Sequence, residues 1–318
     1  MANMRIRFRG EEFEIELYEE KAPKACAALR RAGKVTSMIV YAKICDHEIT
    51  WPMPYLVDEL ENPVWEEELG SVIYYPQSQS ICIFYGPTPA VAWCNQIGKV
   101  APEDIDRLAS VADDVWAHEG QLIETEADPL EGMAHPCDSD ILLAPTGNKA
   151  VDAFVERSGD AYDAVWNAPS PDIRRMLHKN IGIGKNLSTS VFAFGDTSAI
   201  EGDAWTWYRR GKGRKGDLGT LTSLAAERLT GAAKSFRDCY DFQDTANLLE
   251  EAADALGAVN THAELASVAF ALERYLVLIH YWVDAAIPFA ELCPAHAEMI
   301  RARLSIPDWQ VGVTVTPD

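Results

Sequence analysis

Carboxylate and aromatic side chains lie close together in the irregular stretch around residues 48–61. Glu48 and Glu61 flank Trp51 and Tyr55 there. A carboxyl group beside aromatic rings can have a raised pKa and can then act as a general acid or base. Because the first half of the chain is rich in acids, a solvated loop carboxylate is the alternative for each of the two.

A second candidate region, residues 74–89, combines aromatic and amide side chains. It contains Tyr75, Gln77 and Tyr85 and ends in Gly86-Pro87-Thr88-Pro89. Such side chains around the mouth of a barrel can line a small-molecule pocket that is apolar with a few polar groups. The alternative, in which the aromatic rings fill a core and the amides form a turn, stays equally open.

Two basic groups in the second half of the chain can bind an anion. The aromatic and basic stretch of residues 205–215 includes Arg209 and two glycines, which predicts a mobile lid that brings positive charge to a ligand. An exposed basic loop is the alternative there, and a solvated helix face is the alternative for the other group. That other group consists of Arg174, Arg175, His178, Lys179 and Lys185.

Several well-known cofactor and nucleophile motifs are missing from the sequence. It contains no GxxxxGK[ST] phosphate loop, no GxGxxG fingerprint after a strand, no HExxH and no GxSxG. The seven cysteines are irregularly spaced and form no CxxC pair, which argues against a disulfide framework and a structural zinc site. We therefore expect no cofactor and no metal, and a reducing cytoplasmic location.

The chain is strongly acidic. It has 28 basic and 49 acidic residues among 318, a formal net charge of −21. Residues 1–140 hold 11 basic and 26 acidic residues (−15), and residues 141–318 hold 17 and 23 (−6). Such an excess disfavours nucleic acid and anionic membranes as partners. No apolar run reaches the length of a membrane span. With nucleic acid and membranes both disfavoured, we expect small-molecule partners.

The first half of the chain has the periodicity of β-strands. Residues 4–9 and 12–17 alternate around Gly10-Glu11, with basic residues on one strand and acidic residues on the other, which predicts a hairpin. A short helix from Pro23 should follow. Further strands are expected at residues 35–44, 71–75, 80–85 and 91–100, then a helix over residues 102–116. Residues 118–149 are polar and acidic, with three prolines, and are interpreted as a connector.

The second half of the chain has the periodicity of helices. Residues 221–240, 242–256 and 262–286 carry apolar residues at helical spacing, with Gly257 as a stop. Short loops between long helices favour an antiparallel bundle. The sequence thus predicts an α+β protein with a strand-rich domain over residues 1–140 and an all-α bundle over residues 141–318. The apolar helices of the bundle also make a homo-oligomer possible.

The order of these elements resembles a known group of bacterial proteins. The hairpin, the Ala22-Pro23-Lys24 helix, Glu61-Asn62-Pro63 and above all the segment Ile81–Pro89 resemble cyclophilin-like proteins over roughly the first 100 residues. With a helical bundle of this length behind it, the chain resembles the cucumopine and mikimopine synthases. This resemblance implies a small cyclophilin-like β-barrel for the first domain.

The resemblance also implies a reaction. L-Histidine condenses with 2-oxoglutarate to an imine, and the imidazole carbon closes a second ring in a Pictet–Spengler cyclisation that uses no nicotinamide. The chemistry needs acid and base groups together with groups that hold carboxylates. We predict Glu48, Glu61, Tyr41 and Tyr75 as catalytic residues. Substrate-binding residues are predicted to be Tyr55, Gln77, Tyr85, Arg175, Lys179, Lys185 and Arg209.

Two other functions stay open at the level of the sequence. One is a non-catalytic cyclophilin-like protein that binds a small molecule. The other is a peptidyl-prolyl isomerase, but the Phe-His-Arg and Gln-Gly-Gly-Asp segments of eukaryotic-type cyclophilin isomerases are missing here. Since fold does not imply function, the isomerase is the weaker alternative.

Overall fold

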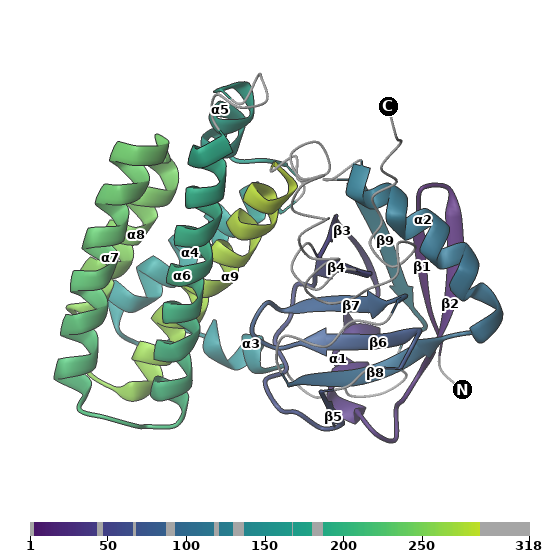
Figure 1. Ribbon diagram of the computed structural model, residues 1–318. Coiled ribbons are helices and arrows are strands. Elements are labelled where there is room, and N and C mark those ends of the chain that lie inside the picture. The colour runs from purple at the N-terminus through teal and green to yellow at the C-terminus, as the bar shows by residue number, and fades with distance from the viewer. Residues whose placement is uncertain are drawn as a thin grey trace. The chain divides into compact units, whose positions relative to one another are not determined.

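The computed structural model describes residues 3–42, 47–65, 68–86, 93–117, 121–129, 137–166, 168–179 and 187–286. Within them the chain divides into two compact units (Figure 1). The first unit runs to Cys137, and the second runs from Asp138 to the last described residue, Ala286. Each unit is described by itself below.

The first unit is a closed antiparallel barrel. Its strands pair in the order β2-β1-β9-β3-β4-β7-β6-β8, and a β2–β8 pairing closes the ring, while the two-residue strand β5 adds to β8. The strands are β1 Asn3–Phe8, β2 Glu11–Leu17, β3 Lys34–Tyr41, β4 Glu48–Pro52, β5 Pro63–Val64, β6 Ser71–Tyr75, β7 Ser80–Phe84, β8 Cys94–Val100 and β9 Gln121–Ala127.

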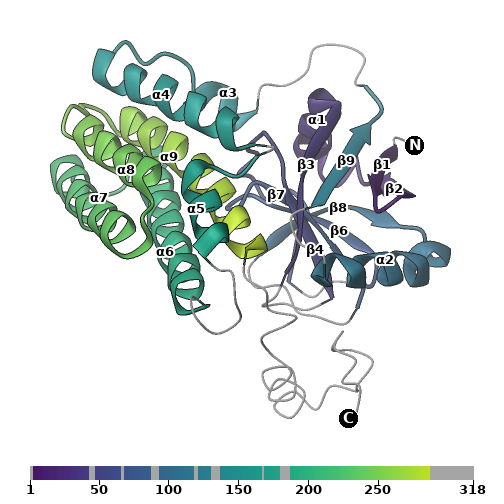
Figure 2. The same ribbon diagram turned by 90° about the horizontal axis from the view of Figure 1, so that it is seen from above.

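Two helices accompany the barrel on opposite sides (Figures 1 and 2). Helix α1 spans Pro23–Ala32 and contacts β9, whereas α2, Ile105–Ala117, packs against β3 and β4 after a short 3₁₀ turn at Pro102–Asp104. Pro23 begins α1, where its missing N–H costs nothing. Gly33 ends α1 with a φ of 65°, a conformation that glycine adopts without strain.

The predicted N-terminal hairpin is confirmed, with its register. Arg9 and Gly10 form the turn with φ values of 54° and 82°, the left-handed pair that suits a tight two-residue hairpin. Arg5 lies opposite Glu14 and Arg7 opposite Glu12. The opposite charges therefore meet across the strands as the alternation predicts.

The prediction that residues 118–149 form a connector is wrong, because they contain β9. This strand lies between β1 and β3 and completes the barrel. Its inward side chains include Ile123 and Thr125, both fully buried, while Glu124 and Glu126 point outward to Arg7. So few apolar residues between acids look like a loop, since the strands that pair with them, β1 and β3, lie far away in sequence.

The two faces of the barrel sheet follow from its register. Directly opposed residues share a face, so the inner face can be traced from Ile6 and Phe13 on the hairpin round to Trp51 and Ile81 on β4 and β7. All four side chains are fully buried. The inner face is therefore the core of the first unit, and the second face of each strand lies outside the barrel.

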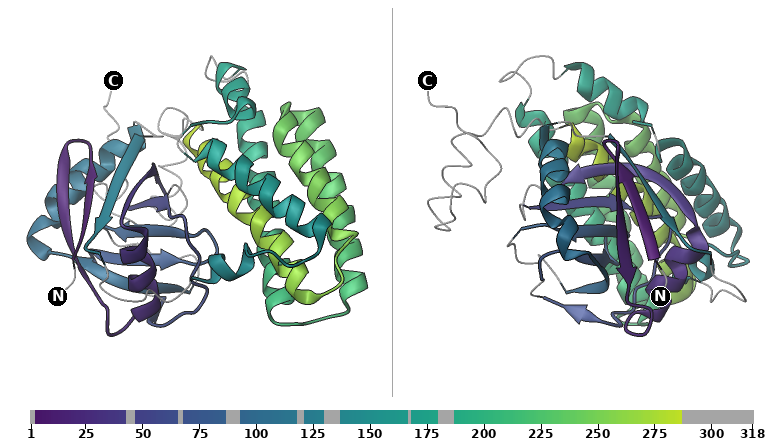
Figure 3. Two further views of the ribbon diagram at one scale, coloured as in Figure 1. Left: turned by 180° about the vertical axis from the view of Figure 1, so that it is seen from behind. Right: turned by 90° about the vertical axis from the view of Figure 1, so that its right-hand side faces the viewer.

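The second unit consists of helices alone. They are α3 Asp138–Leu142, α4 Lys149–Val165, α5 Pro171–Lys179, α6 Leu187–Lys212, α7 Leu218–Tyr240, α8 Gln243–Leu256 and α9 His262–Ala285. Helix α9 is buried on all sides and contacts α4, α5, α6 and α8 (Figures 2 and 3). Side chains of Asn148, Asp217 and Thr261 cap the starts of α4, α7 and α9. The predicted fold class, a β-barrel domain followed by an all-α domain, is confirmed. None of the helices in the described part of the chain is both long and apolar enough to cross a membrane.

Candidate functional site

Glu48 is the first residue of β4 and not part of an irregular region as predicted from the sequence. It lies opposite Phe84 of β7, and its side chain is only 2% exposed. Its carbonyl oxygen accepts a hydrogen bond from the amide of Ala42, at 2.8 Å. A regular strand thus fixes the backbone of the carboxylate that the sequence suggests for acid–base chemistry.

The register places Glu48 on the outer face of the barrel within a row of polar side chains. We call Glu48, Thr50, Tyr75, Ser80, Cys82 and Phe84 the outer-face cluster. The Cys82 thiol is hydrogen-bonded to Thr50 Oγ1, at 3.1 Å, and to Glu48. Ser80 Oγ lies 2.6 Å from Ser78 Oγ. Three neighbouring strands therefore bring a carboxylate, a thiol and hydroxyls to one face.

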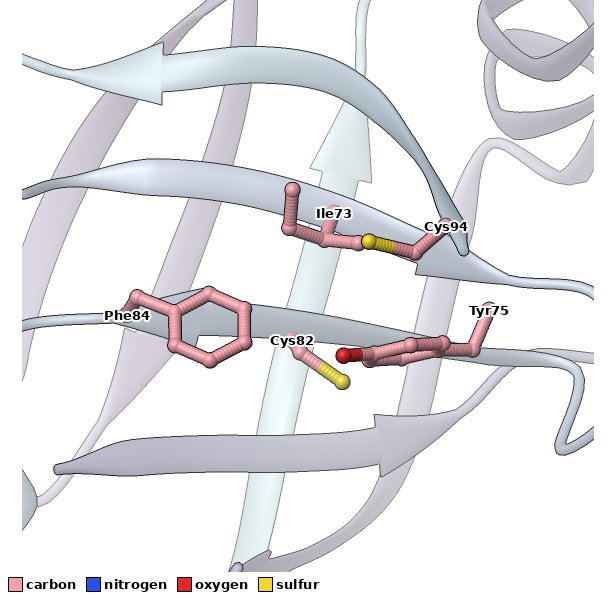
Figure 4. Packing of buried hydrophobic residues seen from close by; sticks show 5 residues of the cluster. All are labelled: Ile73, Tyr75, Cys82, Phe84 and Cys94. Atoms are coloured by element: carbon pink, nitrogen blue, oxygen red, sulfur yellow. The ribbon is translucent and has the colours of Figure 1, made fainter. Parts of the chain in front are cut away.

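Tyr75 adds a phenol to the same cluster. Its side chain is 8% exposed and packs with Ile73, Cys82 and Phe84. Figure 4 shows its hydroxyl directed toward the sulfur of Cys82, with the Phe84 ring beyond. Two of the four predicted catalytic residues, Glu48 and Tyr75, thus belong to one cluster.

Burial sets the protonation of this cluster. Burial first, and then the neighbouring Glu48 carboxylate, raise the pKa of the Cys82 thiol well above its ordinary value. The thiol therefore stays protonated at neutral pH and serves as a hydrogen-bond donor rather than a nucleophile. A carboxylate and a phenol held in surroundings from which water is excluded can exchange protons with a bound substrate.

Tyr41, the last residue of β3, and Tyr85, directly after β7, lie together on the inner side of the barrel sheet. The amide of His47 donates to Tyr41 Oη at 2.9 Å, and Tyr85 Oη donates to Asp113 Oδ1 at 3.0 Å. Tyr41 and Tyr85 are also hydrogen-bonded to each other. Burial, followed by the neighbouring Tyr41 and Asp113, raises the pKa of Tyr85 well above its ordinary value, so the Tyr85 phenol acts as a neutral hydrogen-bonding group.

The sequence patterns did not identify His47 or Asp113 as candidate site residues. The ring of His47 meets the Tyr85 ring edge-on at 5.7 Å between centroids, and a Cβ atom on Gly86 would lie 2.5 Å from it. The glycine that opens the Gly-Pro-Thr-Pro segment was the one available signal of this close approach. Pro87, Thr88 and Pro89 lie outside the described residues.

Tyr55 lies inside the barrel unit, away from the outer-face cluster. Its ring stacks on Tyr74 at 5.4 Å between centroids, and Tyr74 Oη donates to the Tyr55 carbonyl oxygen at 2.8 Å. Burial raises the pKa of the Tyr55 phenol well above its ordinary value. Its buried hydroxyl and the buried Trp51 Nε1 have no hydrogen-bond partner within the part of the chain that the structure describes.

Glu61 has a structural contact that the sequence did not reveal. Its carboxylate accepts the backbone amides of Lys24, at 2.9 and 3.0 Å, and of Ala25, at 3.0 Å. It therefore caps the N-terminus of α1, where the helix dipole stabilises a negative charge. The amide of Glu61 in turn donates to Asn95 Oδ1 at 3.0 Å. Gln77 is exposed in the turn between β6 and β7.

The predicted basic residues belong to the second unit. Arg175 and Lys179 lie on α5, and Lys185 lies outside the described residues. Arg209 is exposed on α6, with its guanidinium 5.8 Å from the centroid of the Trp205 ring.

The prediction that residues 205–215 form a lid or a loop is wrong for most of them. Residues up to Lys212 are the last turns of α6, and Tyr208 is fully buried, 5.9 Å from the Phe270 ring. The basic residues lie at the end of a long helix, where the dipole favours them. No three His, Cys, Asp or Glu side chains within the described ranges converge as metal ligands would.

Known proteins similar to this chain agree with its architecture. Residues 2–116 match the family model described as Cyclophilin-like. The matched segment of this chain ends before β9. The structure of McbB in complex with tryptophan is similar to this chain, with a TM-score of 0.75 and 18% sequence identity, over 95% of this chain and 100% of that chain. At this identity the likeness establishes a shared fold.

A second solved structure matches a smaller part. The solution structure of the hypothetical protein AF2241 from Archaeoglobus fulgidus shares 28% identity over 39% of this chain and 93% of its own, with a TM-score of 0.33. The chain has no match among curated proteins. The predicted cyclophilin-like character of the first domain is thus supported by a family match.

Proposed function

We propose that this protein is a Pictet–Spengler-type synthase that joins an L-amino acid to a 2-oxo acid. The observation that carries the proposal is the buried carboxylate of Glu48 on the same outer face of the barrel as the Tyr75 phenol. Burying a carboxylate is costly unless it is hydrogen-bonded, and acid–base chemistry is one reason to keep it. The tryptophan bound to the similarly folded McbB adds support for an amino acid as substrate.

Tryptophan and histidine share the two groups that this reaction needs. Each has an α-amino group that can form an imine with a ketone, and each has an electron-rich ring carbon placed to attack that imine. From the resemblance to the cucumopine and mikimopine synthases, we propose L-histidine and 2-oxoglutarate as the substrates. McbB with its tryptophan makes L-tryptophan the natural competitor to test.

The protons and bonds of the reaction balance without an oxidant or reductant. The free amine attacks the ketone, and a C–N bond forms. The carbinolamine takes up a proton at its oxygen and loses water to give an iminium ion. The ring carbon then attacks, a C–C bond forms, and the ring gives up a proton. The product is the sum of both substrates minus one water.

Glu48 and Tyr75 are suited to the two proton transfers. We assign the Tyr75 phenol as the donor to the departing oxygen and the Glu48 carboxylate as the acceptor of the ring proton. Arg175, Lys179, Lys185 and Arg209 remain the proposed partners of the substrate carboxylates. Glu61 and Gln77 are weaker candidates, because the Glu61 carboxylate caps α1 and Gln77 is exposed in a turn.

The test is incubation of the purified protein with L-histidine and 2-oxoglutarate, without NAD(P)H. Mass spectrometry should detect the summed mass less one water, and chiral separation should show a single stereoisomer. A reaction without protein measures the spontaneous background, and a parallel reaction with L-tryptophan tests the donor. Product at the background rate with both donors would contradict the proposal.

A non-catalytic binding protein is the second candidate, since the similarly folded McbB is seen with a bound amino acid. Calorimetric titration with L-histidine and L-tryptophan separates the two functions. Binding without turnover in the presence of 2-oxo acids would favour the binding protein. Turnover well above background would exclude it.

A further inference from the structure

A chain of hydrogen bonds connects helix α2 to the start of β4. We call His47, Tyr41, Tyr85 and Asp113 the α2–β4 chain. We propose that Asp113, acting through Tyr85 and Tyr41, is a positioning residue that fixes the start of β4 and with it the carboxylate of Glu48. This inference rests on the proposed role of Glu48, and it assigns a positioning role to Tyr41 and Tyr85, which the sequence predicts as catalytic and substrate-binding residues.

Two of the hydrogen bonds in this chain have a defined direction. Tyr85 donates its hydroxyl proton to the Asp113 carboxylate at 3.0 Å. The amide of His47 donates to Tyr41 Oη at 2.9 Å. Tyr41 and Tyr85 are hydrogen-bonded to each other between these two bonds, so a continuous chain joins the backbone before β4 to the carboxylate, an arrangement in which neighbouring bonds polarise one another.

The chain ends one residue before Glu48, where other bonds also hold the backbone. The amide of Tyr85 donates to the His47 carbonyl at 2.9 Å, and the amide of Ala42 donates to the Glu48 carbonyl at 2.8 Å. The Glu48 side chain lies on the opposite face of the sheet from Tyr41 and Tyr85. A shift of the His47 backbone therefore moves the Glu48 carboxylate without any direct contact to these rings.

His47 needs such support because its backbone is strained. Its φ of 47° is in the left-handed region that non-glycine residues seldom adopt. Residues in this region persist where the surrounding structure holds them. Here the Tyr41 hydroxyl, the Tyr85 amide and the close fit against Gly86 do so.

Asp113 brings one end of the α2–β4 chain to the protein surface. It is exposed on α2, whereas Tyr41 and Tyr85 are 1% and 4% exposed. Helix α2 packs on both β3 and β4, so a change at its surface reaches the strand that carries Glu48. A displacement of about 1 Å at a reacting group can lower turnover by about 100-fold, so even a partial loss of the chain should be measurable.

The experiment compares Asp113→Asn and Tyr85→Phe with a matched control. Asp106→Asn makes the same change in charge at an exposed position of the same helix. We expect kcat to fall about 10-fold in Asp113→Asn and Tyr85→Phe with KM little changed, and the double variant to fall no further. Asp106→Asn should keep the wild-type kcat. Thermal melts check that all variants are folded.

A second readout does not depend on activity. Hydrogen exchange of the His47 amide, followed by NMR, should become about 10-fold faster in Asp113→Asn and Tyr85→Phe but not in Asp106→Asn. Unchanged exchange in both variants would overturn the proposal, as would faster exchange with an unchanged kcat. If the wild-type protein forms no product, the proposed function fails by itself. Affinity for L-histidine or L-tryptophan then replaces kcat, and an affinity that Asp113→Asn leaves unchanged, or that is absent altogether, overturns the positioning role.

Discussion

Two parts of the barrel's outer face differ in what surrounds them. On β1, β2 and β9 the outer side chains are mostly charged and at least partly exposed, and Arg7 pairs with Glu12, Glu124 and Glu126. On β4, β6 and β7 the outer side chains are buried except for the half-buried Thr50, and they include Glu48. The first part alternates between core and solvent, as an ordinary antiparallel sheet does.

The difference shows where a polar group needs an explanation. A charge on the exposed part is solvated and costs little, so its presence says nothing about function. A carboxylate on the buried part costs free energy unless it is hydrogen-bonded, so its presence asks for a reason. The outer-face cluster is for this reason a candidate site, and the charged face of the hairpin is not.

Removing the Phe84 ring from the outer-face cluster should have the largest effect. We expect Phe84→Ala to lower the free energy of unfolding by about 3–5 kcal/mol, because it removes a side chain that is 1% exposed. Leu122→Ala is the matched change on the outer face of β9, where Leu122 is 49% exposed, and should cost less than about 0.5 kcal/mol. Urea unfolding measures both. Equal losses would mean that the two parts of the outer face are alike in solution.

Removing the charge of Glu48 should have the next largest effect. We expect Glu48→Gln to lower turnover about 100-fold, because the amide cannot accept the ring proton. Glu16→Gln removes a carboxylate from the exposed outer face of β2 and should leave turnover within about two-fold. The assay is product formation from L-histidine and 2-oxoglutarate. Wild-type turnover in Glu48→Gln would remove this residue from the proposed mechanism.

The exposed charges should have the smallest effect, and it should depend on pH. Lys34 and then Arg7 hold the pKa of Glu124 below its ordinary value, and Arg7 does the same for Glu126. A lowered carboxyl pKa in the folded state gives stability that is present above the unfolded pKa of about 4.3 and is lost as pH falls through the folded pKa. Arg7→Ala should therefore lower the melting temperature slightly at pH 7 and flatten its decline between about pH 5 and 3.

Salt provides the control for this last comparison. Dissolved salt screens the attraction between exposed charges, with a Debye length of about 10 Å at 0.1 M that shortens as salt is added. The difference in melting temperature between Arg7→Ala and the wild type should therefore shrink in about 1 M NaCl. The gap between Phe84→Ala and the wild type should not shrink. An Arg7→Ala melting temperature that matches the wild type at both pH 7 and pH 3 would contradict the role of these pairs.

The sequence predicts elements whose patterns are local. The hairpin follows from alternation around Gly10, and the strands Ser71–Tyr75 and Ser80–Phe84 follow from runs of β-branched and aromatic residues. Strand β9 could not be found in this way, because its acids pair with Arg7 on β1 and Lys34 on β3, which are neighbours in the barrel but far away in sequence.

The sequence predicts the chemical types of the candidate site residues better than it predicts their positions in the fold. Glu48 and Tyr75 were selected for their chemistry, and the register of three strands brings them to one face. The cap that Glu61 makes on α1 joins residues 37 apart in sequence, and the bond of Tyr85 to Asp113 joins residues 28 apart. Such contacts depend on the closed barrel, and no local pattern announces them.

The place of β9 in the barrel also bears on how the protein is made. Met4 of β1 pairs with Ala127 of β9, so the two residues that close this seam are 123 positions apart. During translation the ribosome must therefore release nearly the whole first unit before its first strand finds a permanent neighbour on that side. Until then the edges of β1 and β3 are open to other chains, and such long-range pairing makes folding slow. The nascent chain is therefore most exposed to aggregation and to chaperones before this seam forms.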